Sequence, residues 1–174
     1  ESPNLVFEGP SVAVVSAWRF LVNPVRTAPT ISVVKDINHN KVPHLFVGSG
    51  ATVFNDPANY PWTMSWTPHY ASEGAIYAKY ILSTKPDARI GILYQNDDLG
   101  RDYLIGFKKG LGDKAAAMIV SSQTYNTIDP PIDSQVVFLK ASGANVFLSV
   151  TVPNFPAWPF PRPIVLPQPS MSCR

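Results

Sequence analysis

Residues 89–113 read RIGILYQNDDLGRDYLIGFKKGLGD, and this stretch decides the fold. The apolar run Arg89–Tyr94 is typical of a strand in a parallel sheet that is covered on both faces. A polar loop, Gln95–Gly100, follows, and helical spacing of apolar residues predicts a helix over Asp102–Leu111. Gly112 stands where a helix ends, in the position that favours glycine. The stretch is therefore a strand–loop–helix unit.

The residues after this unit continue the same alternation. Ala117–Ser121 is a predicted strand, and Asp133 is a predicted N-cap of a helix to Ala141 that Gly143 ends. Asn145–Val150, NVFLSV, is the last predicted strand. A β-α-β-α-β order with short connections builds a right-handed, parallel sheet with helices on both faces. The fold class is therefore α/β with parallel sheets flanked by helices.

The residues before the unit predict two kinds of element. Ser72 is a predicted cap of a helix that runs to about Leu82. Its predicted buried stripe consists of Ile76, Tyr77, Tyr80 and Ile81. Further upstream, Arg19–Val22, His44–Val47 and Trp62–Trp66 are predicted strands. Thr30 is a predicted N-cap of a helix to Asn38.

The two ends of the chain do not follow this pattern. Residues 1–17 show one possible strand, and residues 153–174 contain seven prolines within 153–169. Because proline removes a backbone donor and fixes φ, the C-terminal segment is predicted to be an irregular, extended tail. A second interpretation is that the tail is a recognition ligand for an aromatic groove.

The composition excludes several classes of protein. Charged residues make up 15% of the 174 residues and the formal net charge is +2, with basic residues scattered, so no nucleic-acid footprint is present. The single cysteine, Cys173, excludes an internal disulfide and a cysteine-based zinc site. The three histidines lack metal-ligand spacing. The sequence begins with Glu1 and not with Met, so we expect that an export signal has been removed or was never included. The apolar stretch from Val12 to Val25 is too short and too interrupted to span a bilayer.

Ligands of parallel α/β sheets bind at the carboxyl ends of the strands, which here are the loops 23–30, 48–52, 95–100 and 151–155. The loop Gly48–Thr52 has a G-x-G core but no third glycine, so a dinucleotide site is weakly supported. Two interpretations of this loop remain open. One is a simple turn, and the other is capture of a small molecule through the hydroxyl groups of Ser49 and Thr52 and the carbonyl group of Ala51.

Two further features of these loops each allow more than one functional interpretation. Thr27, Thr30 and the free amides around residues 30–32 lie at a predicted helix start, which suits a carboxylate or a phosphate, although ordinary capping also explains Thr30. The acidic loop residues Asn96, Asp97 and Asp98 form a solvated turn more readily than a metal site. The chain contains no nucleophile motif and no facing carboxylate pair, so we expect no enzyme, no cofactor and no metal.

Three stretches resemble the extracellular ligand-binding proteins of branched-chain amino-acid ABC importers. They are residues 25–82, beginning VRTAPTISVVKDINHNKVPHLFVGSGAT, residues 89–113, and residues 132–148, IDSQVVFLKASGANVFL. The resemblance implies a type I periplasmic-binding fold with two partial lobes, 1–67 (1–17 poorly matched) and 68–152, followed by the tail 153–174. Pro68 and Ser72 would mark the crossover between the lobes.

The resemblance also implies the site. Thr30, Ala51 and Thr52 match groups that hold the ligand carboxylate and ammonium, and Leu99 stands where some relatives place an aromatic cover. Ser49 and Thr151, in strand-tip loops, complete the predicted set of ligand-binding residues. Arg26 departs from the family pattern, and no later carboxylate matches the usual partner of the ammonium.

The implied function is the periplasmic solute-binding component of an ABC importer for branched-chain or related amino acids. Its partners would be an amino-acid-like ligand and a membrane permease, and the chain would be a monomer. A ligand-sensing receptor domain and, less favoured, a nucleotide-dependent doubly wound enzyme are the alternatives. Relatives are about twice as long and lack the proline-rich ending, so we expect a fragment, with a frameshift after Phe155 as a hypothesis. Each ligand-binding group that the fragment lacks would make the free energy of ligand binding less favourable by about 1–3 kcal/mol.

Overall fold

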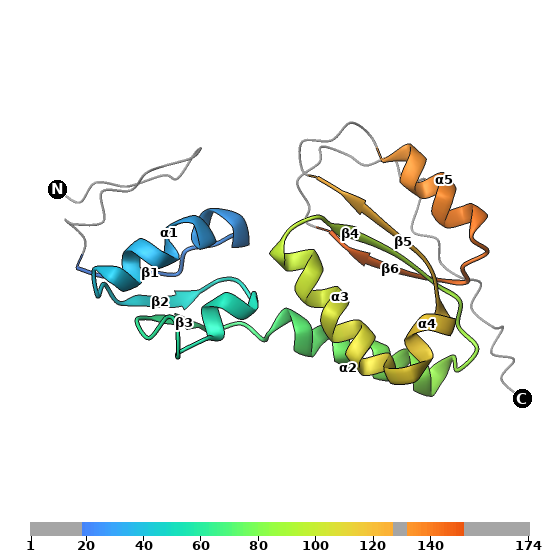
Figure 1. Ribbon diagram of the computed structural model, residues 1–174, viewed down its shortest axis with the longest axis horizontal. Helices are drawn as coiled ribbons and strands as arrows, with labels where there is room; N and C mark the ends of the chain where they lie inside the picture. The colour runs from blue at the N-terminus through green and yellow to red at the C-terminus, as the bar shows by residue number, and fades with distance from the viewer. Residues whose placement is uncertain (1–18, 127–131, 152–174) are drawn as a thin grey trace, which may run out of the picture.

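The structure is a computed structural model, which describes residues 19–126 and 132–151. It is an α/β fold with two parallel, three-stranded sheets (Figure 1). The predictions for residues 1–17 and for the tail 153–174 lie outside the described residues. We call the part built on the first sheet the first unit, and the part built on the second sheet the second unit.

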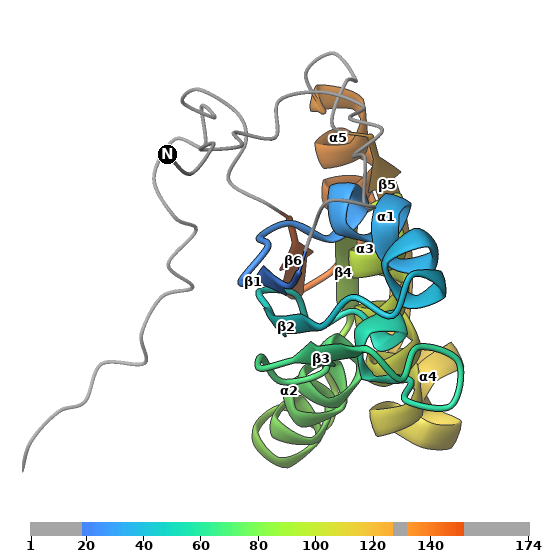
Figure 2. The same ribbon diagram turned by 90° about the vertical axis from the view of Figure 1, so that its left-hand side faces the viewer.

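The first unit contains three short strands and one long helix. Its strands are β1 (Leu21–Val22), β2 (His44–Val47) and β3 (Thr63–Ser65), in the spatial order β1-β2-β3. The helix α1 (Thr27–His39) joins β1 to β2, and a short 3₁₀ helix, η2 (Thr52–Asn55), follows β2. The helix packs onto one face of the sheet (Figure 2). The buried apolar side chains of this unit are Val34, Ile37, Val42, Val47, Ala51 and Phe54.

The second unit is a three-layer arrangement. The strands β4 (Ile90–Gln95), β5 (Ile119–Tyr125) and β6 (Val146–Val150) lie in the order β5-β4-β6. Helices α2 (Tyr70–Thr84) and α3 (Asp98–Leu111) cover one face, and α5 (Asp133–Ala141) covers the other (Figure 1). Short segments η3 (Gly112–Lys114) and α4 (Ala115–Met118) connect α3 to β5. The central strand β4 is buried on both faces, as its apolar run predicts.

Glycines set the close packing of α2 against α3. A Cβ atom added at Gly106 would lie 1.9 Å from the carbonyl oxygen of Ala71, and one added at Gly74 would lie 2.4 Å from that of Tyr103. The buried residues of α2 are accordingly small, Gly74 and Ala78. The predicted stripe was therefore wrong for Ile76, Tyr77 and Tyr80, which are exposed. Residue size, and not apolar character, selects the buried face of this helix.

The helix starts also differ from the sequence predictions. The helix α1 begins at Thr27, and the hydroxyl of Thr30 donates to the carbonyl oxygen of Arg26 at 2.6 Å instead of capping the helix. The helix α3 begins at Asp98 because the side chain of Asp97 accepts from the amide of Gly100 at 3.2 Å. In α3 this side-chain cap lets the first turn form earlier than the apolar pattern predicts, whereas Arg26, the N-cap of α1, makes no side-chain capping hydrogen bond.

Three smaller differences concern α2, α5 and β5. Tyr70, and not Ser72, begins α2, whose N-cap is His69. Asp133 is the first residue of α5 and not its N-cap. The predicted strand at residues 117–121 is shifted, because α4 occupies residues up to Met118 and β5 begins at Ile119. The predicted strand His44–Val47 and the helix-ending Gly112 and Gly143, both with positive φ, are confirmed.

Candidate ligand-binding site

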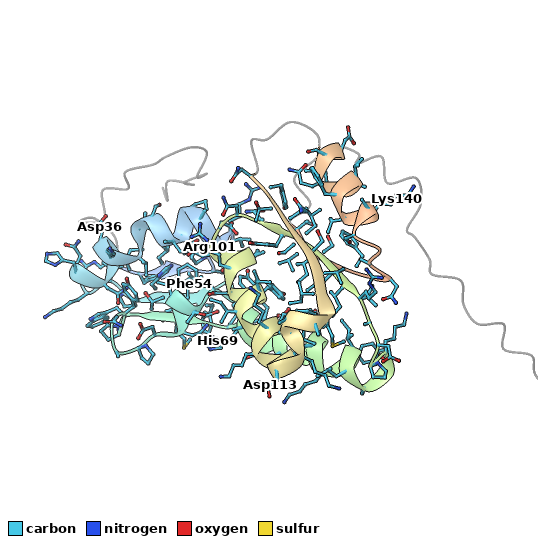
Figure 3. All side chains as sticks on the ribbon, turned by 45° about the vertical axis from the view of Figure 1, so that its right-hand side comes forward. Asp36, Phe54, His69, Arg101, Asp113 and Lys140 are labelled. Atoms are coloured by element: carbon cyan, nitrogen blue, oxygen red, sulfur yellow. The ribbon has the colours of Figure 1, made fainter. Side chains whose placement is uncertain are left out.

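The two units meet where β3 leads into α2. The backbone amide of Tyr70, the first residue of α2, donates to the carbonyl oxygen of Gly50 at 2.9 Å. A Cβ atom at Gly50 would lie 2.1 Å from the carbonyl oxygen of Pro68, so no larger residue fits there without movement of the backbone. The residue labelled His69 in Figure 3 marks this junction. The loop 48–52 is thus fastened to the start of the second unit.

Three hydroxyl groups from separate elements meet at this junction. The Oγ1 of Thr27, at the start of α1, lies 2.8 Å from the Oγ of Ser49 and 3.5 Å from the Oη of Tyr70. The Oγ of Ser49 lies 3.3 Å from the same Oη. Thr27 and Ser49 are buried, while Tyr70 is partly exposed. We call these three residues the hydroxyl cluster.

The loop Gly48–Thr52 has its polar groups arranged by this cluster. The amide of Ala51 donates to the Oγ of Ser49 at 3.4 Å, and the carbonyl oxygen of Ala51 accepts from the amide of Phe54 at 3.1 Å. Ser65, at the end of β3, donates its hydroxyl to the carbonyl oxygen of Ser49 at 2.8 Å. The loop is therefore held from both sides before any ligand arrives, which is the preorganisation that a binding site needs.

One contact in this region joins the two units through a charge. The backbone amide of Thr52 donates to the Oδ2 of Asp102, on α3, at 2.7 Å. A hydrogen bond to an ionised carboxylate is short and roughly twice as strong as a neutral one. The amide that the family resemblance assigns to a ligand carboxylate therefore holds a carboxylate of the protein itself.

Aromatic rings stack beside this contact. Tyr103, next to Asp102 on α3, stacks on Tyr70 with ring centroids 5.0 Å apart and planes 20° apart. Its ring also lies 6.4 Å from that of Tyr77. The hydroxyl of Tyr103 donates to the carboxylate of Glu73, and burial, together with this carboxylate, raises the pKa of Tyr103 far above its usual value. Tyr103 therefore stays neutral and fixes α3 against the start of α2.

The six predicted site residues fall into two groups. Ser49, Ala51 and Thr52 lie together in the loop at the junction, with Thr52 exposed. Leu99 is half-buried and lies one turn before Asp102, so it is on the same side of α3.

The other two residues are less well placed. Thr30 is buried one turn inside α1, and its hydroxyl is used within the helix. Thr151 follows β6, and its Oγ1 lies 3.2 Å from the Oγ of Ser149, with no other contact to the described part of the site.

Sequence reasoning missed Tyr70 and Asp102. A signal for Tyr70 is its position two residues after Pro68, at the predicted crossover. A signal for Asp102 is the helical spacing of three from Leu99, which places both side chains on one face.

The described residues offer no metal site. No group of three His, Cys, Asp or Glu side chains within 19–126 and 132–151 is placed to hold a metal ion. Nor does any helix in these ranges have the length and apolar character needed to cross a membrane.

Comparison with known proteins identifies the class of fold and then the family. The two parallel sheets with their flanking helices place the chain in the α/β class. The family model described as periplasmic binding protein matches residues 16–158, and the chain belongs to that family. No curated protein matches the chain.

Solved structures of similar fold include ABC-transporter solute-binding proteins and an extracellular ligand-binding receptor. One is a solute-binding protein from R. palustris in complex with benzoate, with 14% identity and a TM-score of 0.67, over 78% of this chain and 37% of that one. Another, from R. palustris BisB5, is in complex with 3,4-dihydroxy benzoic acid (13% identity, TM-score 0.65, covering 81% and 38%).

A third is an extracellular ligand-binding receptor from Rhodopseudomonas palustris HaA2 (17% identity, TM-score 0.64, covering 75% and 36%). These likenesses show the type I periplasmic-binding fold. The chain spans little more than a third of the length of these three proteins.

Proposed function

We propose that this chain supplies part of the ligand cleft of a solute-binding component of an ABC importer, and that its solute is a small carboxylate such as a branched-chain or related amino acid. The observation that carries the proposal is the 2.7 Å hydrogen bond from the amide of Thr52 to the Oδ2 of Asp102, because it shows that this amide binds a carboxylate. It supports carboxylate recognition by an amide at the junction of the two units.

The hydroxyl cluster supports the same ligand class. Thr27 is the first residue of α1, so the amides of Thr27 and Ala28 have no partner within the helix, while Pro29 has no amide hydrogen. Such amides, with the partial positive charge of a helix start, favour a carboxylate. Hydroxyls of Ser49 and Tyr70 add groups that donate to a carboxylate after a change of rotor. The proposal involves binding without chemical change of the solute.

An aromatic carboxylate is a second candidate ligand. The solved structures of similar fold include complexes with benzoate, 4-hydroxybenzoate and 3,4-dihydroxy benzoic acid. In this chain the stacked rings of Tyr70 and Tyr103 lie beside the hydroxyl cluster. Flat aromatic surfaces favour a ring as partner in offset or edge-on geometry. This stack is the feature that favours an aromatic solute.

Membership of the family supports a proposal for the wider role. We propose a periplasmic location, a membrane permease as partner, a monomeric state, and a division into partial lobes between residues 67 and 68. A sensing domain with the same ligand chemistry is the alternative role. Adjacency of the gene to permease and ATPase genes would favour transport, and adjacency to a signalling gene would favour sensing.

The ligand class is tested by NMR titration of the isotope-labelled 174-residue chain. We expect leucine or benzoate, at millimolar concentration, to shift the amide signals of Thr27, Ala51 and Thr52. Millimolar affinity corresponds to about 4 kcal/mol of binding free energy, and a weak value follows from the partial cleft. Benzamide has the shape of benzoate without its charge, and we expect it to leave these signals in place.

A matched pair of variants locates the site. Thr27→Val removes one hydroxyl of the cluster at nearly constant shape and should weaken the affinity for the carboxylate, as measured from these shifts, by about fivefold, as expected for one lost hydrogen bond of about 1 kcal/mol. Thr84→Val makes the same change at the exposed end of α2 and should have no effect. Shifts that are equal with benzamide, or that avoid residues 27–30 and 49–53, would contradict carboxylate binding at this junction.

A further inference from the structure

Asp102 is a charged side chain placed at the junction with a single described partner. Its Oδ2 accepts from the amide of Thr52, and no Lys or Arg within residues 19–126 or 132–151 forms an ion pair with it. A lone carboxylate at a contact between two units is not explained as a salt bridge. Its negative charge acts on any charged group that comes close to Thr52.

The position of Asp102 relative to the hydroxyl cluster is fixed by its neighbours. Tyr103, the next residue, stacks on Tyr70, whose hydroxyl belongs to the cluster. Thr52, which binds Asp102, follows Ser49 by three residues in the same loop. Figure 3 labels Arg101, the residue before Asp102, on the part of α3 that faces the first unit. Asp102 therefore lies at the edge of the proposed carboxylate site.

We propose that Asp102 determines the charge selectivity of this site: it competes with a solute carboxylate for the amide of Thr52 and disfavours solutes with a net negative charge relative to zwitterions of the same shape. This inference rests on the proposed function, since it assumes that a carboxylate binds at the junction. It narrows the solute class towards amino acids and away from simple organic acids.

Two elementary effects act at this position. Competition for one amide weakens the binding of every carboxylate alike, and repulsion between like charges distinguishes an anion from a zwitterion. The amide of Thr52 has one hydrogen, so a solute carboxylate that uses it must displace the Oδ2 of Asp102. A solute carboxylate bound beside the aspartate instead meets a like charge that has no ion-pair partner among the described residues. At a separation of about 6 Å and an effective dielectric constant of about 40, this repulsion weakens binding roughly tenfold. A zwitterion has no net charge, so its ammonium group offsets most of the repulsion.

The test compares leucine with 4-methylpentanoate, which is leucine without its ammonium group. Affinities are measured by NMR titration on the unaltered chain and on Asp102→Asn. We expect the substitution to raise the affinity for 4-methylpentanoate roughly tenfold, and that for leucine by less than about threefold. Asp113→Asn removes the same charge at the opposite end of α3 (Figure 3) and should change neither affinity.

Each other outcome overturns the inference. Equal changes for both solutes in Asp102→Asn, or the same changes in Asp113→Asn, would show that Asp102 has no selective role. Weaker leucine binding with unchanged 4-methylpentanoate binding would mean that Asp102 holds the ammonium group and does not compete for the amide. If neither solute shifts residues 27–30 or 49–53 in any of these proteins, the proposed function fails as well, and the two failures are thereby distinguished.

Discussion

The two sheets of this protein are covered to different extents. In the second unit, α2 and α3 pack on one face of the sheet and α5 on the other, and every residue of β4 except the partly buried Tyr94 is buried. In the first unit, α1 covers one face, while the apolar side chains Val22, Phe46 and Met64 on the three strands are 45–48% exposed within the described structure. The second unit therefore has the larger core and the first unit the more open one.

The unit with the larger core is not the unit that supplies most of the proposed ligand-binding groups. Most of the proposed ligand groups, Thr27, Ser49 and Thr52, come from the first unit, whereas the second unit contributes Tyr70 and Asp102 at the contact. Binding groups on loops need a rigid scaffold to hold them. Here the loop 48–52 gains that rigidity partly from the second unit, through the bond from Tyr70 to Gly50.

The largest effect is expected for a cavity in the second unit. Phe107, on α3, is fully buried among Ala78, Ile90 and Ile92. Phe107→Ala should lower the free energy of unfolding by about 4 kcal/mol, because it removes buried apolar surface and leaves a cavity. Urea unfolding followed by circular dichroism measures the change. Val137→Ala, at an exposed position on α5, is the control and should cost less than about 0.5 kcal/mol. A loss below about 1 kcal/mol at Phe107 would contradict the larger core of the second unit.

A buried histidine makes the first unit the more acid-sensitive of the two. His44, on β2, is inaccessible to solvent; its Nδ1 lies 3.2 Å from the Oγ1 of Thr63, and its Nε2 has no hydrogen-bond partner. Burial lowers the pKa of His44 from 6.5 to about 4. Protonation therefore favours the unfolded state, so stability is fully present above pH 6.5 and is lost as the pH falls towards 4. The loss should reach about 3 kcal/mol.

Residue-specific hydrogen exchange between pH 6.5 and pH 4 measures this loss. The amides of β1–β3 should lose protection before those of β4–β6. His44→Asn should remove most of the pH dependence, whereas His39→Asn, at the exposed end of α1, should retain it. Earlier loss of protection in the second unit would reverse the comparison between the two units.

The sequence predicted the strands better than the helix starts and the contacts between units. The segments His44–Val47 and Arg89–Tyr94 are short, mainly apolar runs with turn residues on either side. Such runs identify buried strands without tertiary information. The buried face of α2 could not be predicted, because Gly74 and Ala78 are selected by the closeness of α3 and not by hydropathy. Periodicity therefore gave the right element and the wrong face.

The candidate site shows the same limit. The loop Gly48–Thr52 was predictable because small residues follow a strand. Tyr70 and Asp102 lie 18 and 50 residues after Thr52, and the contacts Tyr70–Ser49 and Asp102–Thr52 depend on how α2 and α3 pack at the crossover. No local pattern reports such a distant pairing. Thr30 was assigned wrongly as the cap because the first turn of α1 begins at Thr27.

The smallest effect is expected on the open face of the first sheet. Met64, on β3, is 45% exposed, and Met64→Ala should change the free energy of unfolding by less than about 0.5 kcal/mol. Its neighbour Thr63 points to the covered face, where its Oγ1 accepts from the Nδ2 of Asn38 at 2.7 Å, so Thr63→Ala should cost about 1 kcal/mol or more. Two adjacent residues thus report on the two faces of one strand in the same urea titration. A cost at Met64 comparable to that at Phe107 would mean that this face is covered in the folded protein, and the contrast between the units would then disappear.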